Sequence, residues 1–153
     1  MRISIGCDHR GKNMKSQLVE FLRGRGHEVD DCGMYDEDSA ACSDYPDIAE
    51  TVSRKVSEGT ADRGVLICGT GIGMQIVANK FPGVRAAVCP DELTAEIARR
   101  HNNLNVLCLS GDMVGERALE GILIAWLDIP FENGRHQRRL DKIAEIEKSL
   151  HLR

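Results

Sequence analysis

Strand-like and amphipathic segments alternate along the chain. Strand-like segments lie at residues 3–7, 27–31, 63–68, 84–89 and 105–110. Segments with helical periodicity lie at 12–25, 45–57, 72–80, 94–101 and 114–127, with residues 33–44 as a polar loop. Because helical patterns separate the strands, the order predicts βαβ units and a parallel sheet. The predicted fold class is α/β: a Rossmann-like three-layer sandwich, in which helices cover both faces of a five-stranded parallel sheet.

The tail differs from this repeating pattern. Residues 135–150 read as one more helix, with Leu140, Ile143, Ile146 and Leu150 on one side. Its first turn is basic, and cations at a helix N-terminus oppose the helix dipole. A solvated charged turn and an anion site completed by another subunit both fit these residues. We expect one domain, 1–153, with an α/β core (1–130) and a C-terminal dimerisation helix (131–153) that docks on a partner subunit.

Composition narrows the function classes. The net charge of -4 and an aromatic content of 4% argue against a nucleic-acid partner. Every apolar run is far shorter than the roughly 20 residues that span a bilayer, and no signal peptide is evident, so we expect a cytoplasmic protein without a membrane partner. The cysteines form no Cys-x-x-Cys pair. Cys7, Cys32, Cys89 and Cys108 are expected to be small buried hydrophobes, and Cys42 lies in the polar loop.

The segment from Val65 to Gly73 carries the strongest chemical signal. A buried strand ends in Cys68, and glycines follow at alternate positions before a helix begins. Glycine-rich turns and helix N-termini offer unpaired backbone N–H groups to anions. The same field favours the thiolate, which is the reactive form of cysteine. The segment therefore places a candidate base beside a candidate oxyanion pocket.

Ligands of parallel sheets bind outside the carboxyl ends of the strands. The segments delivered there are 8–11, 68–73, 90–92 and 111–112. His101 closes the helix before the last strand, which puts it at the opposite edge unless that helix is short or bent. It is either a C-terminal cap or, followed by Asn102 and Asn103, a functional residue.

Three interpretations of the glycine loop compete. A dinucleotide site wants G-x-G-x-x-G after the first strand, and a P-loop wants a Gly-Lys-Ser/Thr ending; this loop has neither. An oxyanion pocket for an enolate-type intermediate, with a cysteine base beside it, is the interpretation that uses Cys68. A non-catalytic sensor of phosphorylated ligands would need the pocket but not the thiol.

The chain resembles the B-type ribose-5-phosphate isomerases and the relatives that isomerise allose and galactose phosphates. The resemblance spans essentially the whole chain. It rests on Gly6-Cys7-Asp8-His9, Asp44-Tyr45-Pro46, Ile67-Cys68-Gly69-Thr70-Gly71-Ile72-Gly73, Ala78-Asn79-Lys80, Arg85-Ala86, His101-Asn102, Asn105-Val106-Leu107 and Gly134-Arg135-His136.

The resemblance implies a cofactor-free and metal-free aldose–ketose isomerase of the pentose phosphate pathway, within carbohydrate metabolism, acting on ribose 5-phosphate and ribulose 5-phosphate. It assigns catalysis through a cis-enediolate to Cys68 as base, with Thr70, and ring opening to His101 and Asp8. The implied substrate-binding residues are His9, Tyr45, Gly69, Gly71, Ile72, Gly73, Asn102, Arg135 and Arg139, of which His9 and the arginines hold the phosphate. The implied assembly is a homodimer or a dimer of dimers, in which subunits share the active site and a partner supplies the arginines.

Two positions depart from the family pattern. Asp112 stands where relatives carry an arginine at the phosphate end, and Arg10 stands where a small residue is usual. We hypothesise that Arg10 either restores the lost positive charge or pairs with Asp112; alternatively, the preferred sugar has changed. Cys68 and Thr70 favour the ribose-phosphate branch, while allose 6-phosphate or a related aldose is the alternative substrate, and a non-catalytic phospho-sugar-binding module the alternative function.

Overall fold

The computed structural model describes residues 1–33 and 44–151; residues 34–43 of the expected polar loop, Cys42 among them, lie outside this range. The strands are β1 (Arg2–Cys7), β2 (Glu28–Asp31), β3 (Arg63–Cys68), β4 (Ala86–Val88) and β5 (Val106–Ser110). The helices are α1 (Lys12–Gly24), α2 (Tyr45–Ser57), α3 (Ile72–Ala78), α4 (Glu92–Asn102), α5 (Glu116–Asp128) and α6 (Arg135–His151).

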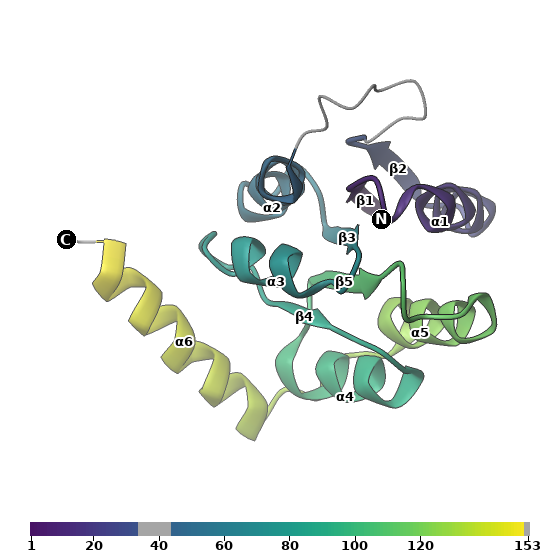
Figure 1. Ribbon diagram of the computed structural model, residues 1–153. Coiled ribbons are helices and arrows are strands. Elements are labelled where there is room, and N and C mark those ends of the chain that lie inside the picture. The colour runs from purple at the N-terminus through teal and green to yellow at the C-terminus, as the bar shows by residue number, and fades with distance from the viewer. Residues whose placement is uncertain (34–43, 152–153) are drawn as a thin grey trace.

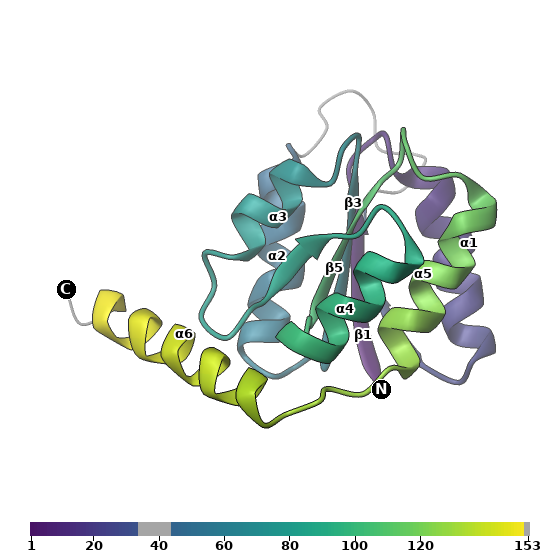
Figure 2. The same ribbon diagram turned by 90° about the horizontal axis from the view of Figure 1, so that it is seen from below.

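The strands of the described range form one five-stranded parallel sheet in the order β2-β1-β3-β5-β4. Helices α1, α4 and α5 pack on one face and α2 and α3 on the other (Figures 1 and 2). The central strand β3 is apolar throughout its middle, as expected for a strand buried on both faces. The predicted α/β, Rossmann-like three-layer sandwich is confirmed.

The strand order reverses direction between β1 and β3. The chain runs outward from β1 to β2, and then returns across β1 to place β3 on its other side. Cys7 and Ile67 are register partners, so β1 and β3 end at the same level. Ligands of open parallel sheets bind outside the strand ends at this switch point. The fold therefore directs the segments that follow β1 and β3 to one place.

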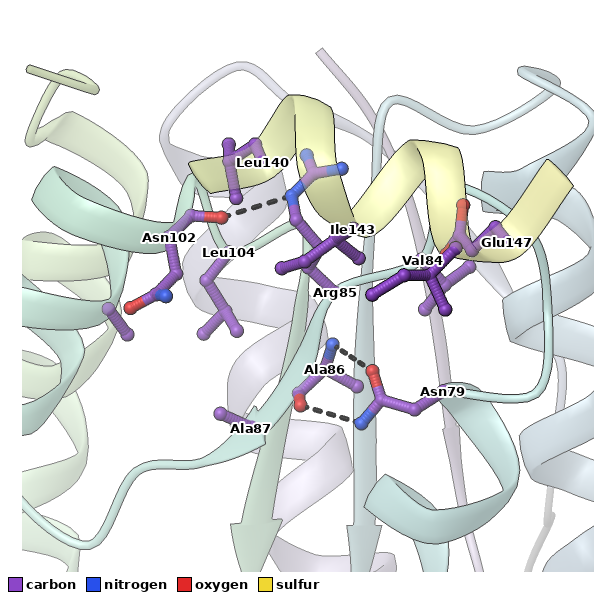
Figure 3. Close-up of a pocket in the computed structure, with 12 residues that line it drawn as sticks. Asn79, Val84, Arg85, Ala86, Ala87, Asn102, Leu104, Leu140, Ile143 and Glu147 are labelled. Carbon is purple, nitrogen blue, oxygen red and sulfur yellow. Dashed lines mark hydrogen bonds between the residues drawn. The ribbon is translucent and has the colours of Figure 1, made fainter. Parts of the chain in front are cut away.

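The boundaries around β4 differ from those expected. The helix expected to reach residue 80 ends at Ala78, and the strand expected at 84–89 covers only Ala86–Val88. The side chain of Asn79 explains both ends. Its Nδ2 donates to the carbonyl of Ala86 at 2.9 Å, and its Oδ1 accepts from the N–H of Ala86 at 2.9 Å (Figure 3). The side chain of Asn79 thus forms hydrogen bonds with both the N–H and the carbonyl of Ala86, the first residue of this edge strand.

Helix α6 extends away from the three layers (Figure 1). His136 and Leu140, in its first turns, are buried against the domain. Farther along, Ile143, Ile146 and Leu150 are exposed, with 58% of Ile146 accessible to solvent. Burying this apolar stripe against another surface would be favourable. The docking of α6 on a partner subunit stays a prediction.

The cysteines follow their expected burial with one exception. Cys7, Cys89 and Cys108 are fully buried, and Cys108 lies in the middle of β5. The prediction is wrong for Cys32, which is only partly buried because polar partners surround it. Its Sγ lies 3.1 Å from the hydroxyl of Ser4 and 3.3 Å from the ammonium of Lys55.

None of the helices over residues 1–33 and 44–151 is both long and apolar enough to cross a membrane.

Candidate active site

Three loops meet where the parallel strands end. The N–H of Asp8, which follows β1, donates to the carbonyl of Ile67 in β3 at 3.0 Å. The N–H of Gly111, which follows β5, donates to the carbonyl of Cys68 at 2.8 Å. These backbone hydrogen bonds tie the three loops together. The chemistry-bearing segments after β1, β3 and β5 therefore form one rigid edge.

Cys68 is the last residue of β3 and only 6% exposed. The backbone N–H of Gly71 donates to its Sγ at 3.1 Å. This hydrogen bond holds the sulfur in a fixed position at the start of the glycine loop.

Unpaired backbone N–H groups lie in the same loop. Within residues 1–33 and 44–151, the N–H groups of Thr70 and Gly73 donate to no other residue. The hydroxyl of Thr70 accepts from the N–H of Ile72 at 3.3 Å, which fixes its orientation. Such donors stabilise negative charge that develops on a substrate oxygen. The arrangement can therefore serve as an oxyanion pocket beside Cys68.

Two of the glycines are required by the shape of this loop. Gly71 has φ 77°, in the left-handed region that L side chains disfavour, and it lies against Val88 and Leu109. A Cβ at Gly73 would lie 2.6 Å from the ring of Tyr45. Tyr45, at the start of α2, therefore packs directly on the glycine loop and forms a wall of the site.

Asp8 and His9 stand on the loop after β1. Asp8 is nearly buried, and its carboxylate accepts the N–H of Arg10 at 2.8 Å. His9 is exposed at the same edge. The structure thus groups Asp8, His9 and Tyr45 with the loop of Cys68.

Arg10 and Asp112 form a bidentate ion pair over the glycine loop. Nε of Arg10 lies 3.0 Å from Oδ1 of Asp112, and Nη2 lies 2.6 Å from Oδ2. The hydrogen bond to Asp112 raises the pKa of Arg10 above its usual value. A Cβ at Gly69 would lie 3.0 Å from Oδ2, so the carboxylate touches the loop. Of the two hypotheses for Arg10, the structure supports pairing: Asp112 balances its charge.

The remaining predicted residues lie elsewhere in the chain. His101 and Asn102 end α4, which runs antiparallel to the strands, and Arg135 and Arg139 lie in the first turns of α6. This region is at the amino edge of the sheet, opposite the end of β3 (Figure 2). The structure therefore separates these four residues from Cys68, as the position of His101 in the sequence predicts.

A groove of about 510 Å³ opens near this second cluster, between α6 and the edge strand β4 (Figure 3). Leu140 and Ile143 of α6 face Val84 and Leu104 of the core across it, and Ile146 also lines it. Arg85 crosses its floor and donates from Nε to the carbonyl of Asn102 at 3.0 Å. The apolar lining suits packing more than chemistry, and Cys68 is not part of it.

The sequence did not assign roles to Glu132 and His136. The ring of His136 stacks on that of His101, with centroids 4.2 Å apart and planes 5° from parallel. Glu132 places a carboxylate oxygen 3.8 Å from Nε2 of His101 and 3.6 Å from Nε2 of His136. The sequence signal for this cluster was the basic start of the tail, which contains His136. It did not indicate that the ring of His101, 35 positions earlier, is the stacking partner.

Known proteins resemble this chain over most of its length. A family model described as Ribose/Galactose Isomerase matches residues 3–143. Ribose-5-phosphate isomerase B of Escherichia coli is 44% identical over 147 residues, which cover 96% of this chain and 97% of that protein.

Solved structures give the same picture. The Clostridium thermocellum ribose-5-phosphate isomerase B has a TM-score of 0.92 and 45% identity, covering 98% of this chain and 99% of that one. The Mycoplasma genitalium enzyme, solved with bound ribulose-5-phosphate, has a TM-score of 0.90 and 44% identity, with 96% of each chain covered.

Proposed function

Because the chain belongs to the ribose/galactose isomerase family, we propose that it interconverts ribose 5-phosphate and ribulose 5-phosphate with Cys68 as the catalytic base. The protein is an aldose–ketose isomerase. The observation that carries the assignment of the base is the sulfur of Cys68, which accepts the N–H of Gly71 beside the unpaired amides of its loop.

The proton transfer follows from this loop. The thiolate of Cys68 takes the proton from C2 of the open-chain aldose, and the electron pair moves onto the C1 carbonyl oxygen to give the cis-enediolate. The proton of the C2 hydroxyl then passes to the neighbouring C1 oxygen, which leaves the negative charge on the C2 oxygen. The N–H groups of Thr70 and Gly73, with the hydroxyl of Thr70, stabilise the charge as it develops. The thiol then returns a proton to C1, which gives the ketose. The reaction needs no redox cofactor, because the electron pair stays within the sugar.

The other predicted site residues open the sugar ring or bind the substrate. Asp8 and His101 open the furanose, and Tyr45 and Asn102 shape the site around the chain of hydroxyls. His9, Arg135 and Arg139 bind the phosphate, with Gly69 and Ile72 completing the loop. Arg135 and Arg139 are exposed and one helical turn apart on α6, so both can reach one phosphate.

A site shared between subunits accounts for the distance between the two clusters. In one chain, Cys68 lies at the carboxyl edge of the sheet, while His101 and Arg135 lie at the amino edge. Two subunits packed with opposite orientations would bring one chain's Cys68 to the other chain's His101. The apolar face of α6 supplies surface for that contact. The assembly is a homodimer or a dimer of dimers.

The Arg10–Asp112 pair affects the phosphate end of the site. Because Asp112 balances Arg10, the pair adds no net charge at the edge, and the phosphate depends on His9 and the tail arginines. This arrangement suits a small sugar phosphate. The proposed setting is the pentose phosphate pathway, in the cytoplasm.

Steady-state turnover of two sugars tests the substrate. We expect kcat/KM for ribose 5-phosphate to exceed that for allose 6-phosphate by about tenfold or more, because one extra carbon unit changes binding energy by about 1–3 kcal/mol. The control is ribose without phosphate, which should react poorly. A preference for allose 6-phosphate would assign the chain to the other branch, and binding of both sugars without turnover would indicate a phospho-sugar-binding module.

A further inference from the structure

The stacked imidazoles of His101 and His136 form a compact cluster with Glu132. The side chain of His101, at the end of α4, is partly exposed, whereas His136, in the first turn of α6, is 3% exposed. Glu132 lies in the segment between α5 and α6 and faces both Nε2 atoms. The partly exposed ring of His101 therefore stacks on the buried ring of His136. This arrangement is expected when one side chain holds another in place.

The surroundings of His136 lower its pKa below the usual value of histidine. Burial lowers its pKa first, and the positive charges of His101, Arg135 and Arg139 lower it further, against the opposing effect of Glu132. Nε of Arg135 lies 3.3 Å from Nε2 of His136, and an arginine can only donate. This contact assigns Nε2 as the acceptor of the ring, and Nδ1 is a buried atom without a hydrogen-bond partner among the described residues.

Glu132 stays a carboxylate beside the two rings. Its hydrogen bond to Arg100 lowers its pKa, and the distance from Nε of Arg100 to Oε1 is 2.5 Å. Arg100 is itself anchored by Glu96 one turn earlier in α4, at 2.8 Å. The other carboxylate oxygen, Oε2, is the one that faces the imidazoles. The cluster thus places a fixed negative charge beside both rings.

Two histidines and a glutamate are also ligands that zinc prefers. Their ligand atoms lie within 4.8 Å of one another. The lone pair of each imidazole nitrogen, however, lies in the plane of its ring. Because the planes are 5° from parallel and the centroids 4.2 Å apart, the two lone pairs cannot converge on one ion. The stack therefore fits proton handling and not metal binding.

We propose that His136 is a positioning residue for His101: its buried ring, stacked on the His101 imidazole, fixes the orientation of that imidazole, and Glu132 holds a carboxylate oxygen beside both rings. This inference rests on the proposed role of His101 in ring opening. In that step, His101 donates a proton to the ring oxygen as its bond to C1 breaks, and Asp8 takes the proton of the C1 hydroxyl. The products are the aldehyde and the free hydroxyl.

The test compares His136→Leu, which removes the stacking ring, with His136→Phe, which keeps an aromatic ring that cannot titrate. We expect His136→Leu to lower kcat for ribose 5-phosphate by about tenfold or more, a part of the 10²–10⁴-fold that general acid–base catalysis supplies. His136→Phe should recover most of that loss and keep the pH profile of kcat/KM. Light scattering verifies that both variants assemble as the wild type does.

A second readout separates positioning from a structural role. Ribulose 5-phosphate has no free C5 hydroxyl and stays acyclic, so exchange of its C1 hydrogen with D₂O needs Cys68 but no ring opening. His136→Leu should leave this exchange within about twofold of the wild type, well inside the 10²–10⁴-fold range of an acid–base effect. Equal loss of exchange and isomerisation, no loss of either, or failure of His136→Phe to recover activity would overturn the inference.

Two controls separate this inference from the proposed function. Wild-type protein that neither isomerises nor exchanges would contradict the proposed function itself. A His101→Ala variant that isomerises normally would remove the role on which the inference rests. Loss of wild-type activity in EDTA would favour a metal at the cluster and would overturn the stacking argument.

Discussion

Replacing Cys68 with alanine is expected to lower isomerisation of ribose 5-phosphate by about 10²–10⁴-fold, the usual effect of losing a general base. The described structure offers no evident substitute at this position. Asp8 accepts the N–H of Arg10, and Asp112 is held in a bidentate pair by the Arg10 guanidinium. The segment after the glycine loop, Gln75–Ala78, contains no carboxylate. The exchange of the C1 hydrogen of ribulose 5-phosphate should fall in parallel.

Cys108→Ala is the matched control for this prediction. Cys108 is fully buried in β5 and belongs to the same core cluster as Cys68. Burial raises the pKa of its thiol well above the usual value, so it stays protonated and cannot act as a base. Activity should survive Cys108→Ala, and thermal unfolding should show that Cys68→Ala is folded. A folded Cys68→Ala protein with full turnover would contradict the assignment of the base.

Mixing two inactive variants is expected to restore activity if the site is shared. Cys68→Ala and His101→Ala each damage every site of their own homodimers. When the two are unfolded together and refolded at equal amounts, half of the dimers are mixed, and each has one intact site. Symmetric reassociation therefore predicts about one quarter of wild-type activity. Turnover of ribose 5-phosphate measures the recovery.

The control for mixing uses two changes on the same edge of the sheet. Asp8 and Cys68 follow neighbouring strands of one chain, so Asp8→Ala mixed with Cys68→Ala should regain no activity. No recovery with the His101 pair although mixed dimers form would show that one chain holds the whole site. Recovery with the Asp8 pair would show instead that Asp8 and Cys68 of one site come from different chains. The outcome decides whether the amino-edge cluster belongs to the active site.

The predictable part of the site is the part that follows directly from strand order. Cys68 ends a buried strand, and a parallel sheet brings the end of that strand beside Asp8 and His9. The opposite position of His101 also follows from the sequence, because a helix after a strand returns the chain to the amino edge. The fold class could likewise be predicted without side-chain contacts, because it follows from the alternation of strands and helices along the chain.

The contacts that sequence could not predict join residues far apart in the chain. Arg10 and Asp112 are 102 positions apart, and sequence alone left pairing and charge restoration as equal alternatives for Arg10. The stack of His136 on His101 depends on how α6 returns across the end of α4. The early end of α3 depends on the side chain of Asn79, which bonds to the backbone of Ala86 in β4. The helical periodicity of the sequence carries no information about this contact with a later strand.

The central claim is that the wild-type protein isomerises ribose 5-phosphate by proton transfer through an enediolate. Proton NMR of ribose 5-phosphate with the protein in D₂O tests it most directly. We predict that ribulose 5-phosphate accumulates and that deuterium appears at its C1 carbon as equilibrium is approached, at a rate far above that without protein. Absence of ribulose 5-phosphate, or its formation without any deuterium at C1 even at equilibrium, would contradict the account.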